Sequence, residues 1–325
     1  MIDRRGLLAG MGAMTISGGS VVAQSGTFPN APITVVFPFA AGGKGDLVAR
    51  IVAERAAREF GRPMVVENRS GASGMIGAQM VARAKPDGYT LLFMSTTHTV
   101  LPSLQQAPYD LLQDFAPVFG LFETPMVFVV SGTSNLRTFD DVAAAARSMR
   151  GGLNYSSGGA GSNGHLISIN LLRRLGVTGT HIPFRGSNFA AEAVRAGEVE
   201  LICVTVGDVL EMTRNGSLRA LAVAHKHRAT DMPDVPTMSE LGFAGFEAPS
   251  INAFVAPAGT PVAVLDRLYG GFATAVQDPA VKDRLARIGV ETNPMSRAEL
   301  GDFLRNEFER WRRVIQENGI RLGDG

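Results

Sequence analysis

The feature that most constrains the fold is an apolar run that leads through a turn of small residues into a helical pattern. The run is Ile33–Phe37, the turn is Pro38–Gly43, and the helical pattern extends over Leu47–Phe60. Glycines allow a backbone to approach a ligand closely, and the first amides of a helix have no partner inside it. These amides also lie at the positive end of the helix dipole. The junction therefore predicts a binding site for a carboxylate or phosphate.

Strand and helix patterns alternate through most of the chain, which predicts an α/β fold. One βαβαβ unit has its expected elements at 33–37, 47–60, 64–67, 74–84 and 90–95. A second unit has expected strands at 125–130, 153–157, 181–184, 199–205 and 218–224, and expected helices at 138–149, 164–175 and 188–196. Each unit predicts a mostly parallel sheet flanked by helices. In such sheets ligands bind beyond the carboxyl ends of the strands.

The last third of the chain carries three helical patterns, near 262–277, 280–288 and 297–318, with no long strand between them. We expect them to pack on the first unit, so that the chain crosses between two lobes twice. Two crossings form a hinge, and hinged lobes can close on a ligand. The predicted first lobe is discontinuous, with residues 27–125 and 253–325, and the second comprises 126–252.

Residues 1–23 have the pattern of an export signal. Arg4 and Arg5 precede a mildly apolar stretch, and Val21-Val22-Ala23 resembles a cleavage site. The Sec route is expected, the twin-arginine route stays open because its motif is incomplete, and a short membrane anchor is the alternative. Without this segment 29 basic and 29 acidic residues remain. This balance gives no electrostatic case for binding nucleic acid or a membrane surface.

A second glycine-rich loop, residues 157–164, precedes the helical pattern at 164–175. Ser157, Ser162 and Asn163 offer hydrogen bonds beside free backbone amides. Gly159–Gly164 also matches GxGxxG, a dinucleotide fingerprint, and Arg185 stands after the next strand, where an acid would favour NAD. An NADP-dependent enzyme is therefore one alternative. A glycine-rich turn without a ligand is another.

Two basic residues have open roles. Arg185 precedes Gly186 and Ser187; it either clamps a carboxylate or pairs with an acid such as Glu192. Lys44 either reaches a second acidic group on the ligand or points to solvent. The sequence contains no HExxH, GxSxG or complete P-loop motif. We recognise no nucleophile–base pair, and we expect no catalytic residue, metal or cofactor.

Eight segments in register resemble the Bug family of extracytoplasmic solute receptors, the binding components of tripartite tricarboxylate transporters. The similarity runs from Ile33 to Leu322. Its segments are Pro38–Arg50, Val66–Ala72, Pro86–Leu91, Asp114–Val118, Ile182–Gly186, Leu218–Val223, Pro233–Gly242 and Ala256–Pro261.

The resemblance implies a two-lobed periplasmic-binding-protein-like fold of type II that closes on a small organic carboxylate. It also implies a periplasmic location and delivery to the membrane subunits of a transporter, and we expect a monomer. The first ligand loop maps to Phe39, Ala41, Gly42 and Gly43, which hold a carboxylate through backbone groups and water, with Asp46 at the helix start. The remaining implied contacts are Ser95, Thr96, Ser157, Ser162, Asn163, Gly186 and Ser187.

The chain departs from the family pattern at two positions. Lys44-Gly45 stands where relatives often have Gly-Thr, and Lys44 favours a ligand with a second carboxylate. Val204 stands where many relatives carry an acid that meets a ligand ammonium group, which predicts a carboxylate other than an amino acid. A receptor that presents its loaded form to a membrane signalling protein is the alternative to transport.

Overall fold

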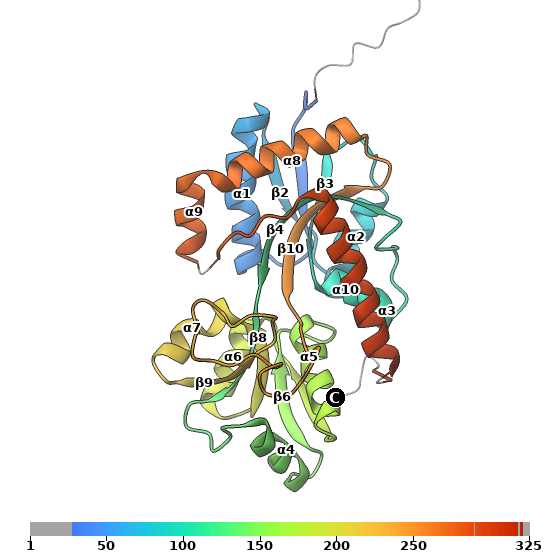
Figure 1. Cartoon of the computed structure of the whole chain (residues 1–325). Coiled ribbons are helices and arrows are strands. Elements are labelled where there is room, and N and C mark those ends of the chain that lie inside the picture. The colour runs from blue at the N-terminus through green and yellow to red at the C-terminus, as the bar shows by residue number, and fades with distance from the viewer. Residues whose placement is uncertain (1–27, 289, 318, 321–325) are drawn as a thin grey trace, which may run out of the picture.

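The described part of the chain forms two α/β lobes, one above the other in Figure 1. The computed structural model describes residues 28–320 except 289 and 318. The predicted export segment, residues 1–23, lies outside these described residues. Each lobe is built on its own five-stranded sheet, so the predicted two-lobed α/β fold is confirmed.

The upper sheet has the strand order β2-β1-β3-β10-β4. Its strands are β1 (Ile33–Phe37), β2 (Met64–Asn68), β3 (Thr90–Ser95), β4 (Phe115–Thr124) and β10 (Ser250–Pro257). Strand β1 pairs in parallel with β2 and β3, whereas β10 pairs antiparallel with β3 and β4. Four of these five strands therefore point the same way, and β10 is reversed.

The lower sheet has the equivalent order β7-β6-β8-β5-β9. Its strands are β5 (Met126–Ser131), β6 (Leu153–Ser157), β7 (Gly179–Pro183), β8 (Leu201–Thr205) and β9 (Leu218–Val223). Here β5 is the reversed strand, paired antiparallel with β8 and β9. In each sheet the reversed strand is the one that enters from the other lobe. The expected mostly parallel sheets are thus mixed sheets with one reversed strand each.

Helices cover the sheets of both lobes. The upper lobe has α1 (Lys44–Phe60), the short helix η1 (Ala72–Gly74), α2 (Met75–Ala82), α3 (Thr97–Leu104), α8 (Val262–Gln277), α9 (Pro279–Ala286) and α10 (Arg297–Glu317). The lower lobe has α4 (Phe139–Ser148), α5 (Asn163–Arg174), α6 (Ser187–Ala196) and α7 (Val206–Arg214). The sequence patterns do not predict α3 or α7, because at most one residue separates each from its preceding strand.

The core of the upper lobe is rich in aromatic side chains. Phe254 of β10 stacks on Phe272 of α8 with ring centroids 4.1 Å apart, and Phe93 of β3 meets Phe254 edge to face at 5.1 Å. All three side chains are at most 1% exposed. Each aromatic ring buries a large apolar area. The sheet edge that carries the ligand loops therefore rests on a well-packed base.

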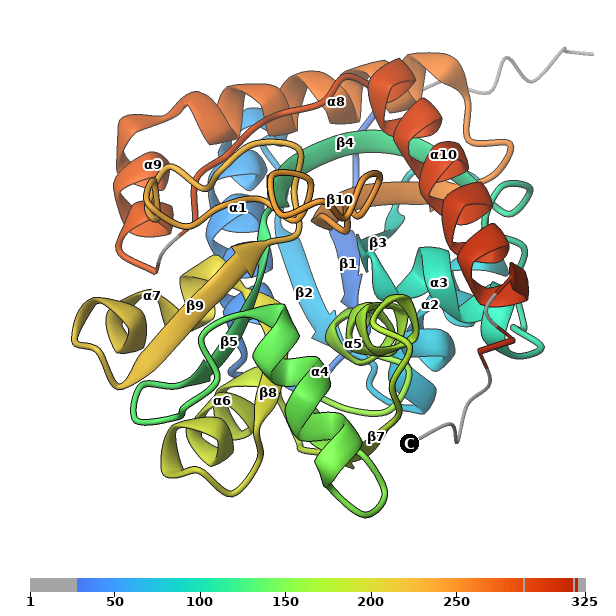
Figure 2. The same cartoon turned by 60° about the horizontal axis from the view of Figure 1, so that its bottom comes forward.

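Helix α10 departs from the expectation that the C-terminal helices pack on the first lobe. It lies beside α3 in Figure 1 and Figure 2, but its C-terminal half extends to the lower lobe. Trp311 and Ile315 belong to the same hydrophobic cluster as Leu166 of α5. A helix of 21 residues is about 30 Å long, which is enough to reach both lobes.

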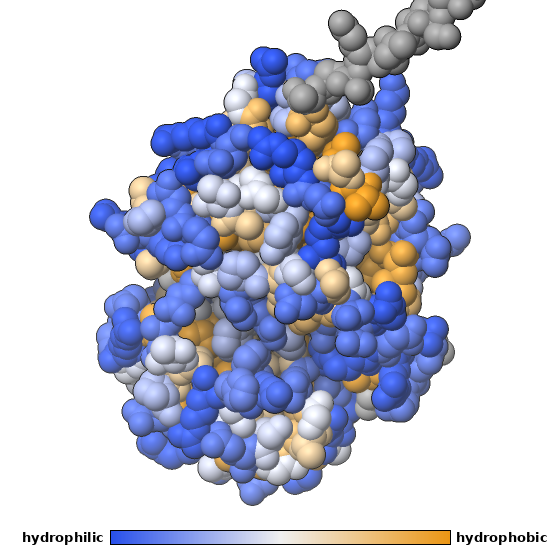
Figure 3. Space-filling model, turned by 45° about the horizontal axis from the view of Figure 1, so that its top comes forward, coloured by the Kyte–Doolittle hydropathy of each residue, from blue (hydrophilic) through white to orange (hydrophobic). Residues whose placement is uncertain are grey.

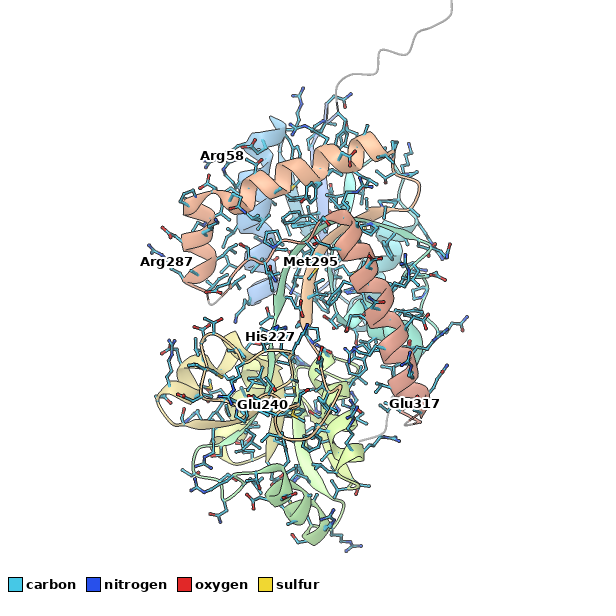
Figure 4. The ribbon with its side chains drawn as sticks, in the orientation of Figure 1. Arg58, His227, Glu240, Arg287, Met295 and Glu317 are labelled. Atoms are coloured by element: carbon cyan, nitrogen blue, oxygen red, sulfur yellow. The ribbon has the colours of Figure 1, made fainter. Side chains whose placement is uncertain are left out.

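Hydrogen bonds also join the lobes where the chain crosses between them. Glu123 Oε1 of β4 lies 3.1 Å from His225 Nε2, which follows β9 of the lower lobe; close by, within the upper lobe, the hydroxyl of Thr96 accepts from the amide of Ile251 at 2.7 Å. None of the helices in the described ranges is both long and apolar enough to cross a bilayer. The face in Figure 3 is mainly hydrophilic, with hydrophobic residues in small separate groups.

Candidate functional site

The carboxyl ends of the parallel strands in the two sheets face each other. In the upper lobe β1, β2 and β3 lead into α1, α2 and α3, and in the lower lobe β6, β7 and β8 lead into α5, α6 and α7. Two contacts join these edges: Lys44 Nζ lies 2.8 Å from Asp208 Oδ1, and Ser73 Oγ donates to the carbonyl of Ala160 at 3.3 Å. The starts of α1 and α7 therefore meet where the lobes touch, and the other four helices begin on the same two strand edges; this junction is called the cleft below.

Most helices that begin at this cleft lack a side-chain cap. Helices α1, α2, α3, α6 and α7 have none, and only α5 is capped, by Ser162. Away from the cleft, Thr138 and Asp141 form a capping box on α4, Asp278 caps α9, and Ser296 and Glu299 bond reciprocally at α10, while α8 is uncapped. A side-chain cap stabilises a helix by about 1 kcal/mol. The cleft thus leaves polar amides available at a cost in stability.

The first-lobe loop, residues 38–46, presents backbone amides. Leu47 makes the first helical hydrogen bond, to the carbonyl of Gly43, so the amides of Lys44, Gly45 and Asp46 precede the helical ladder. Ala41, Gly42 and Gly43 are exposed. Gly42 has a φ of 89°, a left-handed conformation that favours glycine. The ligand contacts expected of these groups stay a prediction.

Asp46 does not extend this set of contacts, because its carboxylate is used inside the loop. The side chain is 4% exposed and accepts hydrogen bonds from the amide of Gly42, from Asn68 Nδ2 and from Arg50 Nε. Burial by itself would raise the pKa of Asp46, but these hydrogen bonds outweigh it and lower the pKa. The ionised Asp46 holds the loop in place, together with the bond from Asn68 to the carbonyl of Phe39.

The loop after β3 contributes less than the resemblance implies. Thr96 is 1% exposed, and its hydroxyl bonds to Ile251 and Pro249 where the lobes join, so it is not available to a ligand in this conformation. Ser95 is half-buried, with its amide and hydroxyl 3.2 and 3.3 Å from His98 Nδ1. His98 is completely buried, and burial lowers its pKa to about 4. A neutral His98, with its ring against that of Phe39, therefore supports the loop.

The second-lobe loop, residues 157–164, ends at a polar side chain without a partner. Asn163, the first residue of α5, is 8% exposed, and its Oδ1 and Nδ2 are buried with no hydrogen bond to the described chain. A buried unsatisfied polar group costs about 1–3 kcal/mol. Ser162 Oγ accepts from the amide of His165 at 3.4 Å and caps the helix. Asn163 is therefore the predicted residue best placed to bond a ligand.

A serine–histidine pair joins this loop to strand β7. The sequence analysis did not recognise the pair. Ser157 Oγ is 2.7 Å from His181 Nε2, and His181 stacks on His165 with centroids 3.7 Å apart. Ser157 is 1% exposed and also bonds to the amide and carbonyl of Gly159. Burial lowers the pKa of His181 to about 4, which makes it a weak base at neutral pH. The hydrogen bonds of the buried Ser157 hydroxyl therefore stabilise the loop.

The third loop, residues 185–187, adjoins the second. A Cβ on Gly158 would lie 3.0 Å from the amide of Ser187, so the two loops are in contact. Gly186 precedes α6 without a side-chain cap, and Ser187 is its first residue. The predicted partner of Arg185 is wrong: Glu192 instead pairs with Arg195 at 2.5 Å. Arg185 is exposed and has no hydrogen bond or ion pair with the described residues.

The two departures from the family pattern, Val204 and Lys44, have surroundings that the sequence did not predict. Val204 is 2% exposed and packs in the core of the lower lobe with Val127 and Val129. Val204 therefore makes no ligand contact of its own in this conformation, and the expectation of a carboxylate other than an amino acid stays a prediction. Lys44 pairs with Asp208 of the other lobe and is 32% exposed, and its contact with a ligand stays a prediction.

The described residues contain no cluster of three or more histidine, cysteine, aspartate or glutamate side chains that could hold a metal ion. The side chain of His225, two residues before His227, bonds Glu123. The GxGxxG segment does join β6 to α5. A Cβ on Gly164 would lie 2.2 Å from the carbonyl of Cys203, so this glycine allows α5 to approach β8 closely.

Comparison with known proteins identifies the family of the chain. Residues 48–320 match the sequence model of the tripartite tricarboxylate transporter family receptor. The chain belongs to this family. It is 33% identical over 320 residues to protein BugT of Bordetella pertussis, covering 97% of this chain and 98% of that protein. The resemblance to Bug receptors is therefore confirmed.

Solved structures agree with this assignment. The periplasmic binding protein BugD superposes with a TM-score of 0.79 at 31% identity, covering 90% of this chain and 99% of that one. MatC of Rhodopseudomonas palustris, solved with bound malate, has a TM-score of 0.78, 30% identity, and coverage of 89% and 100%. Rpa4515 of R. palustris, solved with adipate, has a TM-score of 0.79, 29% identity, and coverage of 90% and 99%.

Proposed function

We propose that the chain is a periplasmic receptor that binds a small organic carboxylate between its lobes. In this proposal it delivers the carboxylate unchanged to the membrane subunits of a tripartite tricarboxylate-type transporter. The chain acts as a monomer, is exported through residues 1–23, and divides into lobes at 27–125 with 253–325 and at 126–252. Membership of a transporter receptor family supports the role, and the malate and adipate in related structures support the ligand class.

One observation carries the proposal: the buried amide of Asn163, at the start of α5, has no partner on a strand edge where the neighbouring helices α6 and α7 begin without caps. The oxygens of a carboxylate accept from the amides of Lys44, Gly45 and Asp46 on one side and from Asn163 Nδ2 on the other. Hydrogen bonds to a charged group contribute about 1.5–3 kcal/mol each. The positive ends of the helix dipoles favour the same negative charge.

Closure of the lobes strengthens this binding. Removing water from the cleft lowers the local dielectric constant, which makes each hydrogen bond to the carboxylate stronger. A carboxylate bound between the lobes supplies the partner that the buried amide of Asn163 lacks. The ligand is held by groups that need no proton transfer, so binding and release require no chemical change.

A catalytic role has little support from the residues at the site. The Ser157–His181 pair is the arrangement nearest to a nucleophile and base, but no carboxylate orients His181 among the described hydrogen bonds. The GxGxxG loop leads into α5. In the loop before the next helix, α6, Arg185 stands where an NAD enzyme would have an acid. An NADP enzyme therefore remains only as an outcome of the test below.

A thermal-shift screen tests the proposal. The chain without residues 1–23 is heated with malate, adipate, citrate, butyrate, amino acids or NADP. A ligand at 100 times its dissociation constant stabilises the native state by about 2.7 kcal/mol, which raises the melting temperature of a protein of this size by roughly 5–10 °C. We expect a shift with one class of carboxylate. A shift with NADP alone, or with none of these compounds, contradicts the proposal.

A further inference from the structure

An ion pair joins the two lobes across the cleft. Lys44 Nζ lies 2.8 Å from Asp208 Oδ1. Lys44 is the first residue of α1 in the upper lobe, and Asp208 lies in the first turn of α7 in the lower lobe. The two side chains are 32% and 10% exposed, so the pair is partly shielded from water and salt. Because it bridges the lobes, the pair exists only while they are close together.

The helix dipoles explain why this pair matters for closure. A cation at the N-terminus of a helix is unfavourable, because it meets the positive end of the dipole. Lys44 is such a cation, and α1 has no side-chain cap to offset it. The negative charge of Asp208, from the other lobe, offsets the positive charge of Lys44. The same negative charge is favourable at the N-terminus of α7 and near that of α1. Opening the lobes therefore leaves Lys44 uncompensated.

A second contact lies nearby along the same strand edges. Ser73 Oγ donates to the carbonyl of Ala160 at 3.3 Å, joining η1 of the upper lobe to the second-lobe loop. Ala72 and Ser73 have φ angles of 46° and 54°, and the glycines on either side also have positive φ. Residues with a Cβ rarely adopt this left-handed conformation, which surrounding contacts must hold. The contact with Ala160 is one such restraint.

We propose that these two contacts form a clasp, Lys44–Asp208 and Ser73–Ala160, which stabilises the closed form of the protein without a ligand. Lys44 then sets affinity by shifting the equilibrium between open and closed forms, and it makes no contact with the carboxylate. A ligand that binds the closed form gains affinity in proportion to the fraction already closed. The clasp therefore changes the affinity for every ligand by one common factor. This last statement rests on the proposed receptor function.

The first test measures closure without any ligand. Spin labels on Arg58→Cys and Arg150→Cys report the distance between lobes, because Arg58 lies on the upper lobe and Arg150 follows α4 in the lower lobe. Cys203 is buried and stays unlabelled. We expect Lys44→Met and Asp208→Asn each to shift the distances to longer values. The exchange K44D/D208K, which restores a pair, returns them towards the wild-type distribution.

Lys282→Met is the matched control, because Lys282 lies on α9 and bonds only to Gln277 of the same lobe. It should leave the distances unchanged. Ser73→Ala should produce a smaller opening than Lys44→Met, since it removes a neutral hydrogen bond. Distances in Lys44→Met and Asp208→Asn that equal those of the wild type overturn the clasp, whether or not any carboxylate binds.

The second test separates a clasp from a ligand contact. Isothermal titration compares the dissociation constants of malate, adipate and butyrate for each variant. A clasp predicts that Lys44→Met and Asp208→Asn weaken every ligand that binds by the same factor, about three- to tenfold. The double variant should be no weaker than either single one. Weakening of the two dicarboxylates alone, by Lys44→Met and not by Asp208→Asn, would make Lys44 a ligand contact and overturn the proposal. Failure of all three acids to bind would count against the receptor function, while the distances still decide the clasp.

Discussion

Helices that begin at the cleft and helices that begin on the outer surface treat their first amides differently. On the outer surface α4, α9 and α10 satisfy them with Thr138, Asp278 and Ser296, whereas α8, which follows Pro261, has no side-chain cap. At the cleft five of six described helices have no side-chain cap. Since a cap contributes about 1 kcal/mol, each uncapped helix at the cleft lacks a stabilisation that the capped outer helices have. Uncapped starts are thus more frequent at the cleft than on the outer surface, and in the proposed function their amides bind the ligand.

The strongest way to break this contrast is to place an acid at the uncapped start of α1. Gly43 has an extended backbone, and nothing lies within 4 Å of a Cβ added there, so Gly43→Asp fits without strain. Its carboxylate would occupy the amides and repel an anionic ligand. Like charges at close range cost several kcal/mol, so carboxylate affinity should fall more than about 100-fold. Isothermal titration checks the affinity, and calorimetric unfolding should show stability unchanged or raised by a few tenths of a kcal/mol.

Two further variants serve as references for Gly43→Asp. Gly43→Ser caps α1 without adding charge, so it should weaken binding by less. Gly270→Asp adds the same charge to α8, where nothing lies within 4 Å of the new Cβ, and should not change affinity. Full affinity in Gly43→Asp would show that the amides of α1 do not hold the ligand.

The second variant removes the amide at the other side of the cleft. Asn163→Leu keeps the branched shape of the side chain but replaces both unpaired polar atoms by methyl groups, so the protein should unfold at the same or a higher temperature. Loss of a hydrogen bond to a charged ligand costs about 1.5–3 kcal/mol, equivalent to roughly 10- to 150-fold in affinity. Titration with malate and adipate measures this. Asn170→Leu, on the same helix, should bind normally, and normal binding by Asn163→Leu would contradict the assignment.

The third variant tests the outer surface. Thr138→Ala removes the capping box of α4, in which Thr138 Oγ1 accepts from the amide of Asp141 at 3.1 Å. We expect a loss of about 1 kcal/mol in the free energy of unfolding, with unchanged carboxylate affinity. Chemical denaturation and titration measure the two quantities separately. A drop in affinity comparable to that of Gly43→Asp would remove the distinction between the two sets of helices.

The smallest expected effect concerns the junction of the lobes. The hydrogen bond to Glu123 raises the pKa of His225 above its usual value. A raised pKa in the folded state means that this stabilisation is complete below about pH 6.5 and fades as the pH rises through the folded pKa. His225→Gln should therefore destabilise the protein more at pH 6 than at pH 9. Denaturation of both proteins at the two pH values checks the direction, and an equal or opposite difference would contradict it.

Features set by local sequence were predictable. An apolar run followed by glycines and a helical pattern predicts β1, α1, β6 and α5 to within a few residues of their observed bounds. The prediction works because the turn and the periodicity are local signals. Asn163 was predicted for the same reason, as a polar residue at a helix start. Helices α3 and α7 were missed because no glycine or proline separates them from β3 and β8.

Features set by distant contacts were not predictable. Lys44 and Asp208 are far apart in the sequence and meet only because both lobes place a helix start at the same cleft. The side chain of Val204 was expected at the ligand, but its strand turns it into the core. His181 reaches Ser157 through the parallel pairing of β6 and β7, in which Ser157 lies opposite Pro183. No local pattern reports such pairings.

The most direct test of the account follows the backbone amides themselves. Nuclear magnetic resonance of the ¹⁵N-labelled protein, titrated with the carboxylate that raises the melting temperature, reports each amide separately. We predict large shifts for the amides of Lys44, Gly45 and Asp46 and for the side-chain amide of Asn163, with little change at the capped start of α4. Shifts that leave these four groups unaffected while others respond would contradict the claim that the cleft amides bind the ligand.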